Sequence, residues 1–389
     1  MGWSPDAGVT MGSPNISGHL DLTTGMYSGQ LDLTTGMYSG QPDPNKEMYY
    51  SLLLVVFEIA GLVISPLGII FNIVTIIVFV KLGFKDKMNI TLVVLAVADT
   101  TILLTLIGYS AVLSPPVVRD VTHMDIIDAL SYLFGWLNVL TTRVAGCLTA
   151  FITLERFLCV AIPFKVKKIF TKRNTILFAV SVYVVLVAYS TPMFVANNIG
   201  LRFNPLYNET VVGLVTSADS LVLESISRGM NVTTEVVSFL LVTFFTLGLV
   251  HSFFHSTKWR ISALSGREGG SMSNRDRKLV KMVLFISLVF IGCCLPSVSA
   301  DIVMLFVKEF TINGKEKFLF LVADAIFFDL SAINSTVNIF IYLKMSSKFN
   351  RAFFELFSCF GTRPSSTSSA KDGTTRSPRE LADVTGQYI

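Results

Sequence analysis

Seven apolar runs, each long enough to cross a membrane, constrain the fold of this chain more than any other feature. A helix needs about 20 mostly apolar residues to span the hydrocarbon core of a bilayer. Runs this continuous predict helices, because a closed barrel would show alternation in segments of about ten residues. Only 15% of the residues are charged, against about 25% in soluble proteins. The runs lie at about 50–80, 88–113, 127–160, 174–197, 234–256, 278–307 and 318–343.

The distribution of lysine and arginine predicts the orientation of the bundle. Basic residues concentrate in the first, third and fifth connections, at 81–87, 165–173 and 258–281. Basic connections remain on the cytoplasmic side, so we expect an extracellular N-terminus, a cytoplasmic C-terminus and a location in the plasma membrane. The net charge of +4 is therefore a topology signal and does not predict nucleic-acid binding.

The chain divides into four parts. We predict an all-α membrane protein, a seven-transmembrane helix bundle followed by a short amphipathic helix on the membrane surface. The N-terminal tail holds an 11-residue tandem repeat, at 20–30 and 31–41, which we attribute to a recent duplication in an unconstrained tail. The predicted parts are a disordered extracellular tail (1–47), the bundle (48–345), the amphipathic surface helix (346–360) and a disordered cytoplasmic tail (361–389).

Several residues outside the runs are candidates for covalent modification. Asn15, Asn208 and Asn231 each begin an Asn-X-Ser/Thr sequon on the predicted outer side. The last two lie in a connection of about 35 residues between the fourth and fifth runs, which we expect to be an outer loop. Cys359 follows the amphipathic segment and is either a palmitoylation site or a free cysteine. The Ser/Thr-rich tail offers sites for a receptor kinase and, once phosphorylated, for arrestin.

Asp99 lies midway along the second apolar run, where a lone charge is costly. It should therefore face the interior and have polar partners. The candidates at comparable depth in their helices are Asn72, Asn334, Ser335 and Asn338. Two interpretations remain open: these groups hold a hydrated sodium ion, or they form a hydrogen-bond network that joins helices. We expect no other metal and no cofactor.

Arg156 ends the third run and is the main candidate for a conformational switch. Asp276, at the start of the sixth run, is a candidate partner, and Glu155 competes with it. A solvated surface charge without a role is the other interpretation of Arg156. A pair of this kind suits a two-state element that an outside ligand shifts by a few kcal/mol. Pro296 would supply a bend in the sixth helix, because it removes a backbone hydrogen bond.

Charged and polar residues in the outer halves of the helices are candidates for the ligand pocket. Arg143 lies inside the third run and needs an anionic partner there. Asp329 or a carboxylate on the ligand could provide it, and a purely structural pair is the other interpretation. The candidate pocket residues are Asn138, Arg143, Asp301, Asp324 and Asp329. No set of nucleophile, base and metal ligands is present, so we predict no catalytic residues and no enzyme activity.

Five motifs in order resemble the rhodopsin-like (class A) G-protein-coupled receptors. They are Asn72, Leu95-Ala-Val-Ala-Asp99, Leu154-Glu-Arg156, Phe290-Ile-Gly-Cys-Cys-Leu-Pro296 and Asn338-Ile-Phe-Ile-Tyr342, and the resemblance covers about residues 50–358. The sequence around the end of the third run is most similar to invertebrate receptors, particularly orphan and chemosensory receptors of gastropod molluscs.

The resemblance implies roles for single residues. Asp99, Asn334 and Asn338 would form the sodium and water network. Arg156 would be released on activation to contact a heterotrimeric G protein, and Tyr342 would swing inward. The sixth helix would move outward about Pro296, with Phe290 repacking beneath it; Cys294 belongs to the same switch.

The chain also departs from the family pattern. Ser131 stands where the family has a disulfide-bonded cysteine, Cys294 replaces a tryptophan, and Ile339 replaces a proline. Asn138 replaces the aspartate of amine receptors, and Ala332 replaces the retinal lysine of visual pigments. These two replacements argue against an amine or retinal. The predicted ligand is a small chemosensory molecule or a neuropeptide, and a membrane transporter or channel is the alternative function.

Overall fold

The structure is a computed structural model. Apart from Met48, Leu52 and Val55, it describes the residues 59–114, 124–162, 165–166, 169–204, 209–217, 219–262, 274–307, 309–310 and 315–361. The predicted N-terminal tail (1–47), with its tandem repeat, and all but Gly361 of the predicted C-terminal tail (361–389) lie outside the described residues. Some described residues, among them Asp276 and Cys359, are described by their backbone alone.

Long helices dominate the described chain, and seven of its segments are long and apolar enough to cross a membrane. The predicted seven-helix bundle is thereby confirmed. The elements are η1 (Ile59–Ile64), α3 (Ser65–Leu82), α4 (Lys87–Val112), α6 (Met124–Ala161), α8 (Lys172–Ala196), β1 (Asn197–Asn204), β2 (Glu209–Thr216), α9 (Ser220–Ser262), α10 (Asn274–Phe306), α11 (Lys317–Met345) and α12 (Ser347–Gly361).

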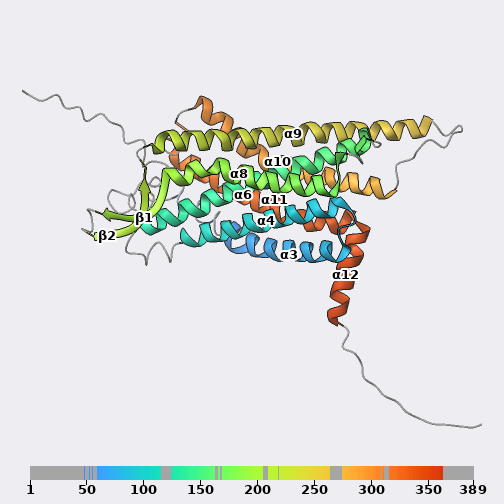
Figure 1. Ribbon diagram of the computed structural model, residues 1–389, viewed down its shortest axis with the longest axis horizontal. Coiled ribbons are helices and arrows are strands. Elements are labelled where there is room, and N and C mark those ends of the chain that lie inside the picture. Colours follow the sequence, from blue (N-terminus) through green and yellow to red (C-terminus); the bar gives the residue numbers. More distant parts are fainter. Residues whose placement is uncertain are drawn as a thin grey trace, which may run out of the picture.

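The long helices lie side by side, with the β1–β2 hairpin at one end and α12 turning away from the bundle axis at the other (Figure 1). We call these the hairpin end and the α12 end. Helix α6 has a central place, because it packs against α4, α8, α9 and α10. Side chains of α6 therefore contact most of the other helices, so a site inside the bundle is expected to include residues of α6.

Local sequence signals explain how the helices begin and end at the α12 end. Gly83 ends α3 with a φ of 75°, in the left-handed region that glycine adopts without strain, and its N–H donates to the carbonyl of Phe79 at 3.1 Å. Asp86 then caps α4, since its carboxylate accepts from the N–H of Met88 at 3.2 Å. The connection between the two helices is thus held tightly, and it places Lys87 at the first turn of α4.

Helix α9 is longer than the sequence predicts, because it begins at Ser220 and not near 234. Val222, Ile226 and Met230 are exposed on its first turns, while most of its buried stripe is polar, as expected for a helix that faces a polar interior. The predicted start near 234, placed where hydropathy falls, was therefore wrong. The buried stripe consists of Ser220, Ser227, Asn231, Glu235, Ser238, Val242, Thr246 and Leu249, at helical spacing.

The connection before α9 is also different from the predicted open loop. Strands β1 and β2 pair antiparallel, with Asn197 opposite Thr216 and Asn204 opposite Glu209. Strand β2 packs against α6. The β-branched residues of β2 favour a strand, but neither strand alternates cleanly between apolar and polar residues, so the pattern alone did not indicate a hairpin.

Helix α12 confirms the predicted amphipathic helix after the seventh span. Phe349 is buried, and its ring lies 5.0 Å from Phe79 of α3 and 5.5 Å from Tyr342 of α11. On the other side, Phe354 and Phe357 are exposed. One face of α12 thus anchors the helix to the bundle, and the exposed phenylalanines are suited to a membrane surface.

Candidate functional site

A partly open cavity lies between α6, α9, α10 and α11, with Ile102 of α4 also in its wall. It is in the half of the bundle nearer the hairpin. Half of its lining residues are aromatic, aliphatic or cysteine side chains and half are polar or charged, so the wall offers both apolar contact and groups that can orient a ligand. The lining residues are Ile102, Asn138, Val139, Thr142, Arg143, Ala145, Glu235, Phe290, Cys293, Cys294, Ser297, Asp324, Phe327, Phe328, Ser331 and Asn334.

The five predicted pocket residues divide into two groups. Asn138, Arg143 and Asp324 line the cavity. Asp301 lies just outside the lining, in the electrostatic surroundings of Arg143 and beside Glu235. Asp329 does not line the cavity.

An ion pair between Arg143 of α6 and Glu235 of α9 dominates the polar side of the cavity. The second oxygen of Glu235 accepts a hydrogen bond of 2.7 Å from the hydroxyl of Ser297 on α10. The suggestion that Asp329 pairs with Arg143 is therefore wrong: α9 brings a carboxylate closer.

Glu235 is the main residue that the sequence analysis missed. The sequence could have indicated this residue, because Glu235 lies inside the apolar run of the fifth helix and a buried arginine requires a carboxylate partner. The misplaced start of that helix near 234 left Glu235 at the predicted mouth of the bundle. With α9 beginning at Ser220, the same carboxylate lies well inside it.

Asn138 connects α6 to α4. Its amide nitrogen donates to the carbonyl of Ile102 at 2.9 Å and to the hydroxyl of Thr105 at 3.0 Å. The residue is buried, and both bonds lie inside the bundle. Asn138 thus fixes the wall of the cavity whether or not it touches a ligand.

Asp99 lies at the centre of the bundle and is almost fully buried. One of its oxygens, Oδ2, accepts a hydrogen bond of 2.9 Å from the amide of Asn338. The other, Oδ1, is buried without a hydrogen-bond partner in the described part of the chain. The hydroxyl of Ser335 lies beside the carboxylate, close enough to interact with it. Asp99 and Ser335 thus place two oxygen atoms together in the buried centre of the bundle.

The remaining predicted members of the polar centre lie around Asp99 at different levels. The amide of Asn72 donates to the carbonyl of Ser335 at 2.8 Å and to that of Gly68 at 3.0 Å, so it joins α3 to α11. Asn334 lines the cavity. The structure thus connects the predicted polar centre to the predicted ligand region through the side of α11 that carries Asn334 and Ser335.

Phe290 and Cys294 of α10 line the cavity, whereas Tyr342 of α11 lies nearer the α12 end. Phe290 is buried against Val242 of α9, and Cys294 packs against the same cluster. Pro296 lies within the continuous helix α10. Tyr342 is buried with its ring 5.3 Å from that of Phe79.

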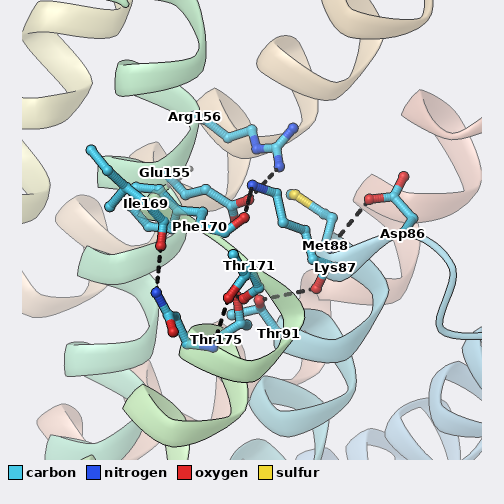
Figure 2. A network of polar contacts seen from close by, with 11 residues as sticks. Asp86, Lys87, Met88, Thr91, Glu155, Arg156, Ile169, Phe170, Thr171 and Thr175 are labelled. Carbon is cyan, nitrogen blue, oxygen red and sulfur yellow. Dashed lines mark hydrogen bonds and ion pairs between the residues drawn. The ribbon is translucent and has the colours of Figure 1, made fainter. Parts of the chain in front are cut away.

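A compact ionic network lies at the α12 end of the bundle (Figure 2). Arg156 contacts Oε1 of the adjacent Glu155 at 3.0 Å, and Lys87 approaches the same oxygen at 3.3 Å. Lys87 also donates a hydrogen bond of 2.8 Å to the carbonyl of Phe170. The side chain of Asp276 lies outside the described residues, so its pairing with Arg156 stays a prediction. In this structure Arg156 is paired with Glu155.

Comparison with known proteins identifies the family. Residues 71–342, well over half of the chain, match the family described as 7 transmembrane receptor (rhodopsin family). The chain belongs to this family. It is also 23% identical over 330 residues to the Allatostatin-A receptor of Bombyx mori, an alignment that covers 82% of this chain and 86% of that receptor. The predicted resemblance to rhodopsin-like receptors is confirmed, and the invertebrate relative agrees with it.

This rhodopsin-family receptor uses its unusual residues as packing elements. Ser131 is buried, and Cys147, Cys293 and Cys294 are free cysteines. Cys294 lines the cavity, where the smaller side chain leaves room that a tryptophan would fill. Ile339 is buried in the main hydrophobic core. The departures from the family pattern thus change the shape of the interior while the seven-helix fold is kept.

The predicted modification sites have different outcomes. Asn15, Asn208 and the side chain of Cys359 lie outside the described residues. Asn231 contradicts the predicted loop position, because it is buried within α9. Its amide donates to the carbonyl of Ser227 at 2.9 Å, and its oxygen accepts from the hydroxyl of Tyr189 at 3.4 Å. A glycan cannot be accommodated on this side chain in the folded receptor.

Proposed function

We propose that this receptor binds a peptide on the outside of the plasma membrane and activates a heterotrimeric G protein inside the cell. The family is one of receptors, and the Bombyx mori relative is named as a receptor for allatostatin A. Together they favour a peptide over a small chemosensory molecule. Exposed lysines at the α12 end, among them Lys85, Lys172 and Lys348, support a cytoplasmic position for that end.

The observation that carries this proposal is the charged cavity between α6, α9, α10 and α11. It is open on one side, and Phe327 and Phe328 are available for apolar or aromatic contact with a side chain of a peptide. The rest of a peptide would lie towards the hairpin end.

The balance of charge in this cavity favours a cationic group on the ligand. Arg143 is already paired with Glu235, so it does not call for a ligand carboxylate. Asp301 and Asp324 share this one guanidinium with Glu235, and among the described side chains no other cation lies in their electrostatic surroundings. A guanidinium or ammonium group would relieve this excess of acid.

A panel of synthetic neuropeptides, allatostatin-A peptides included, tests the ligand proposal. Each peptide is paired with an analogue in which norleucine or citrulline replaces the basic residues, and G-protein activation is measured in cells. We expect a basic peptide to activate the receptor. Its neutral analogue should need an at least about tenfold higher concentration for the same response, since a charge-assisted contact contributes roughly 1.5–3 kcal/mol.

Two variants make this experiment specific for the cavity. Asp324→Asn should reduce the preference for the basic peptide, whereas Asp329→Asn, which changes a carboxyl group outside the cavity, should leave it intact. Equal loss in both variants, or a preference for the neutral analogues, would contradict the assignment of the cationic group to this cavity. Ion flux or solute uptake in these cells would instead favour the transporter or channel.

For activation, we propose that ligand binding repacks Phe290 and Cys294 and lets α10 move outward about Pro296. Phe290 lines the cavity and also packs on α9, so it connects the two regions. Release of Arg156 and an inward movement of Tyr342 would then complete a surface for the G protein. Receptor kinase and arrestin would act at the Ser/Thr-rich tail, beyond the described residues.

A sodium ion is part of this proposal as a modulator of the resting state. Oδ1 of Asp99 and Oγ of Ser335 are buried oxygens that lie beside each other, and oxygen ligands of this kind fit a hard cation. These two residues would hold the ion, with Asn338 keeping the carboxylate in place through its 2.9 Å bond.

A further inference from the structure

Two cations share one oxygen of Glu155 at the α12 end. Lys87 and Arg156 both contact Oε1, while Oε2 is buried without a hydrogen-bond partner among the described residues. Glu155 is 0% exposed. Its single negative charge is therefore surrounded by more positive charge than it neutralises.

Lys87 is held at this position by contacts that do not depend on Arg156. It donates to the carbonyl of Phe170 at 2.8 Å, and its ammonium group lies 5.3 Å from the centre of the Phe170 ring. Phe170 is itself buried and packs against Phe151 of α6 with ring centres 5.4 Å apart. Figure 2 shows Lys87 reaching from the first turn of α4 towards Glu155 and Phe170.

This arrangement changes the free energy of releasing Arg156 in two ways. Two like charges on the same oxygen repel each other, which weakens the hold of Glu155 on Arg156. A buried carboxylate that loses its only cation is also strongly disfavoured, but here Lys87 remains and can use the free Oε2. Both effects make departure of Arg156 easier.

We propose that Lys87 is a positioning residue that keeps Glu155 neutralised while Arg156 leaves it during activation. The inference rests on the proposed function, in which release of Arg156 accompanies coupling to the G protein. It assigns to the first connection of the bundle a part in setting the ligand-free activity of the receptor.

The opposite role would give the opposite sign. If Lys87 were simply a clamp that fastens α6 to α4 in the resting state, its removal would free the inner end of the bundle and raise ligand-free signalling. If Lys87 substitutes for Arg156, its removal leaves Arg156 as the sole partner of a fully buried carboxylate, and ligand-free signalling falls. The two roles are therefore separated by the direction of a single change.

The experiment measures ligand-free G-protein activation by the full chain in cells at matched surface expression. We expect Lys87→Gln to lower it roughly fivefold, the effect of an interaction of about 1 kcal/mol, and Lys87→Arg, which keeps the charge, to remain close to wild type. Glu155→Gln should raise it. In the Glu155→Gln background, Lys87→Gln should have no further effect, because the shared carboxylate is gone.

An unchanged or raised signal in Lys87→Gln would overturn the proposal, as would an equal loss in the Glu155→Gln background. A second measurement keeps it independent of coupling: an environment-sensitive fluorophore on Lys281→Cys, exposed on α10, reports movement of that helix without a G protein. Lys87→Gln should reduce the moved population there too, and no reduction would overturn the proposal. Silence of all chains towards G proteins, with helix movement still dependent on Lys87, would refute the proposed function alone.

Discussion

Removing one partner of the Arg143–Glu235 ion pair should strongly destabilise the receptor. Breaking a buried pair costs about 3–5 kcal/mol, because the remaining charge is left without its partner. For Glu235→Gln we expect the lower value, about 3 kcal/mol, since Asp301 and Asp324 still lie in the electrostatic surroundings of Arg143. For Arg143→Met we expect about 4 kcal/mol, because three carboxyl groups then lose their common cation.

The double variant tests whether the two residues act as a pair. With both charges gone, the remaining cost comes mainly from Asp301 and Asp324, so we expect about 4 kcal/mol, roughly 3 kcal/mol less than the two single losses combined. Glu235→Gln alone should lower the Tm of the purified receptor by roughly 6–12 °C, using the usual conversion for domains of about 200 residues. Asp329→Asn, outside the cavity, is the matched control.

Thermal unfolding of the wild-type chain and the four variants in one detergent provides the measurement. If the single losses simply add in the double variant, Arg143 and Glu235 are not coupled, and the assignment of Glu235 as the partner fails. If Asp329→Asn destabilises the receptor as much as Glu235→Gln, the carboxyl group that supports Arg143 was assigned to the wrong helix.

Two further predictions concern the packing around α6. A methyl group on Gly248 of α9 would come within 2.7 Å of the Phe157 ring, so Gly248→Ala should lower the stability by about 1–3 kcal/mol in thermal unfolding. The control is Gly292→Ala, whose methyl group would have nothing within 4 Å and should leave the stability unchanged. Equal Tm values for the two variants would refute the close approach. Asn138→Ala should cost about 1–3 kcal/mol, because the carbonyl of Ile102 loses a buried donor; full stability would mean that this bond is not formed.

The seven-helix fold could be predicted from the sequence because its signal is local. Each apolar run contains its own length and hydropathy, and the basic connections add the orientation. The start of α9 could not be read in the same way. Its stripe of Ser227, Asn231 and Glu235 is polar because it faces the interior, so hydropathy falls while the helix continues.

The residues of the site were predicted in part. The predictions that failed concern which charged residues pair with each other. The positions of Asn138, Arg143 and Asp324 along their helices sufficed to bring them to one cavity. The partner of Arg143 depends on how α6 and α9 are rotated against each other, which no local pattern contains. Lys87 was counted only as a basic residue of a connection, although its contact with Glu155 spans 68 positions of the chain. Such pairs become visible only when the helices are assembled.

The most direct test of the central claim is whether the purified receptor accelerates GDP release from a heterotrimeric G protein. The account predicts acceleration by the wild-type chain in lipid nanodiscs with a stimulating basic peptide, higher ligand-free release with Glu155→Gln, and loss of release with Arg156→Ala. No acceleration from any class of G protein with the wild-type chain or Glu155→Gln, while the receptor binds the peptide and remains folded, would contradict it.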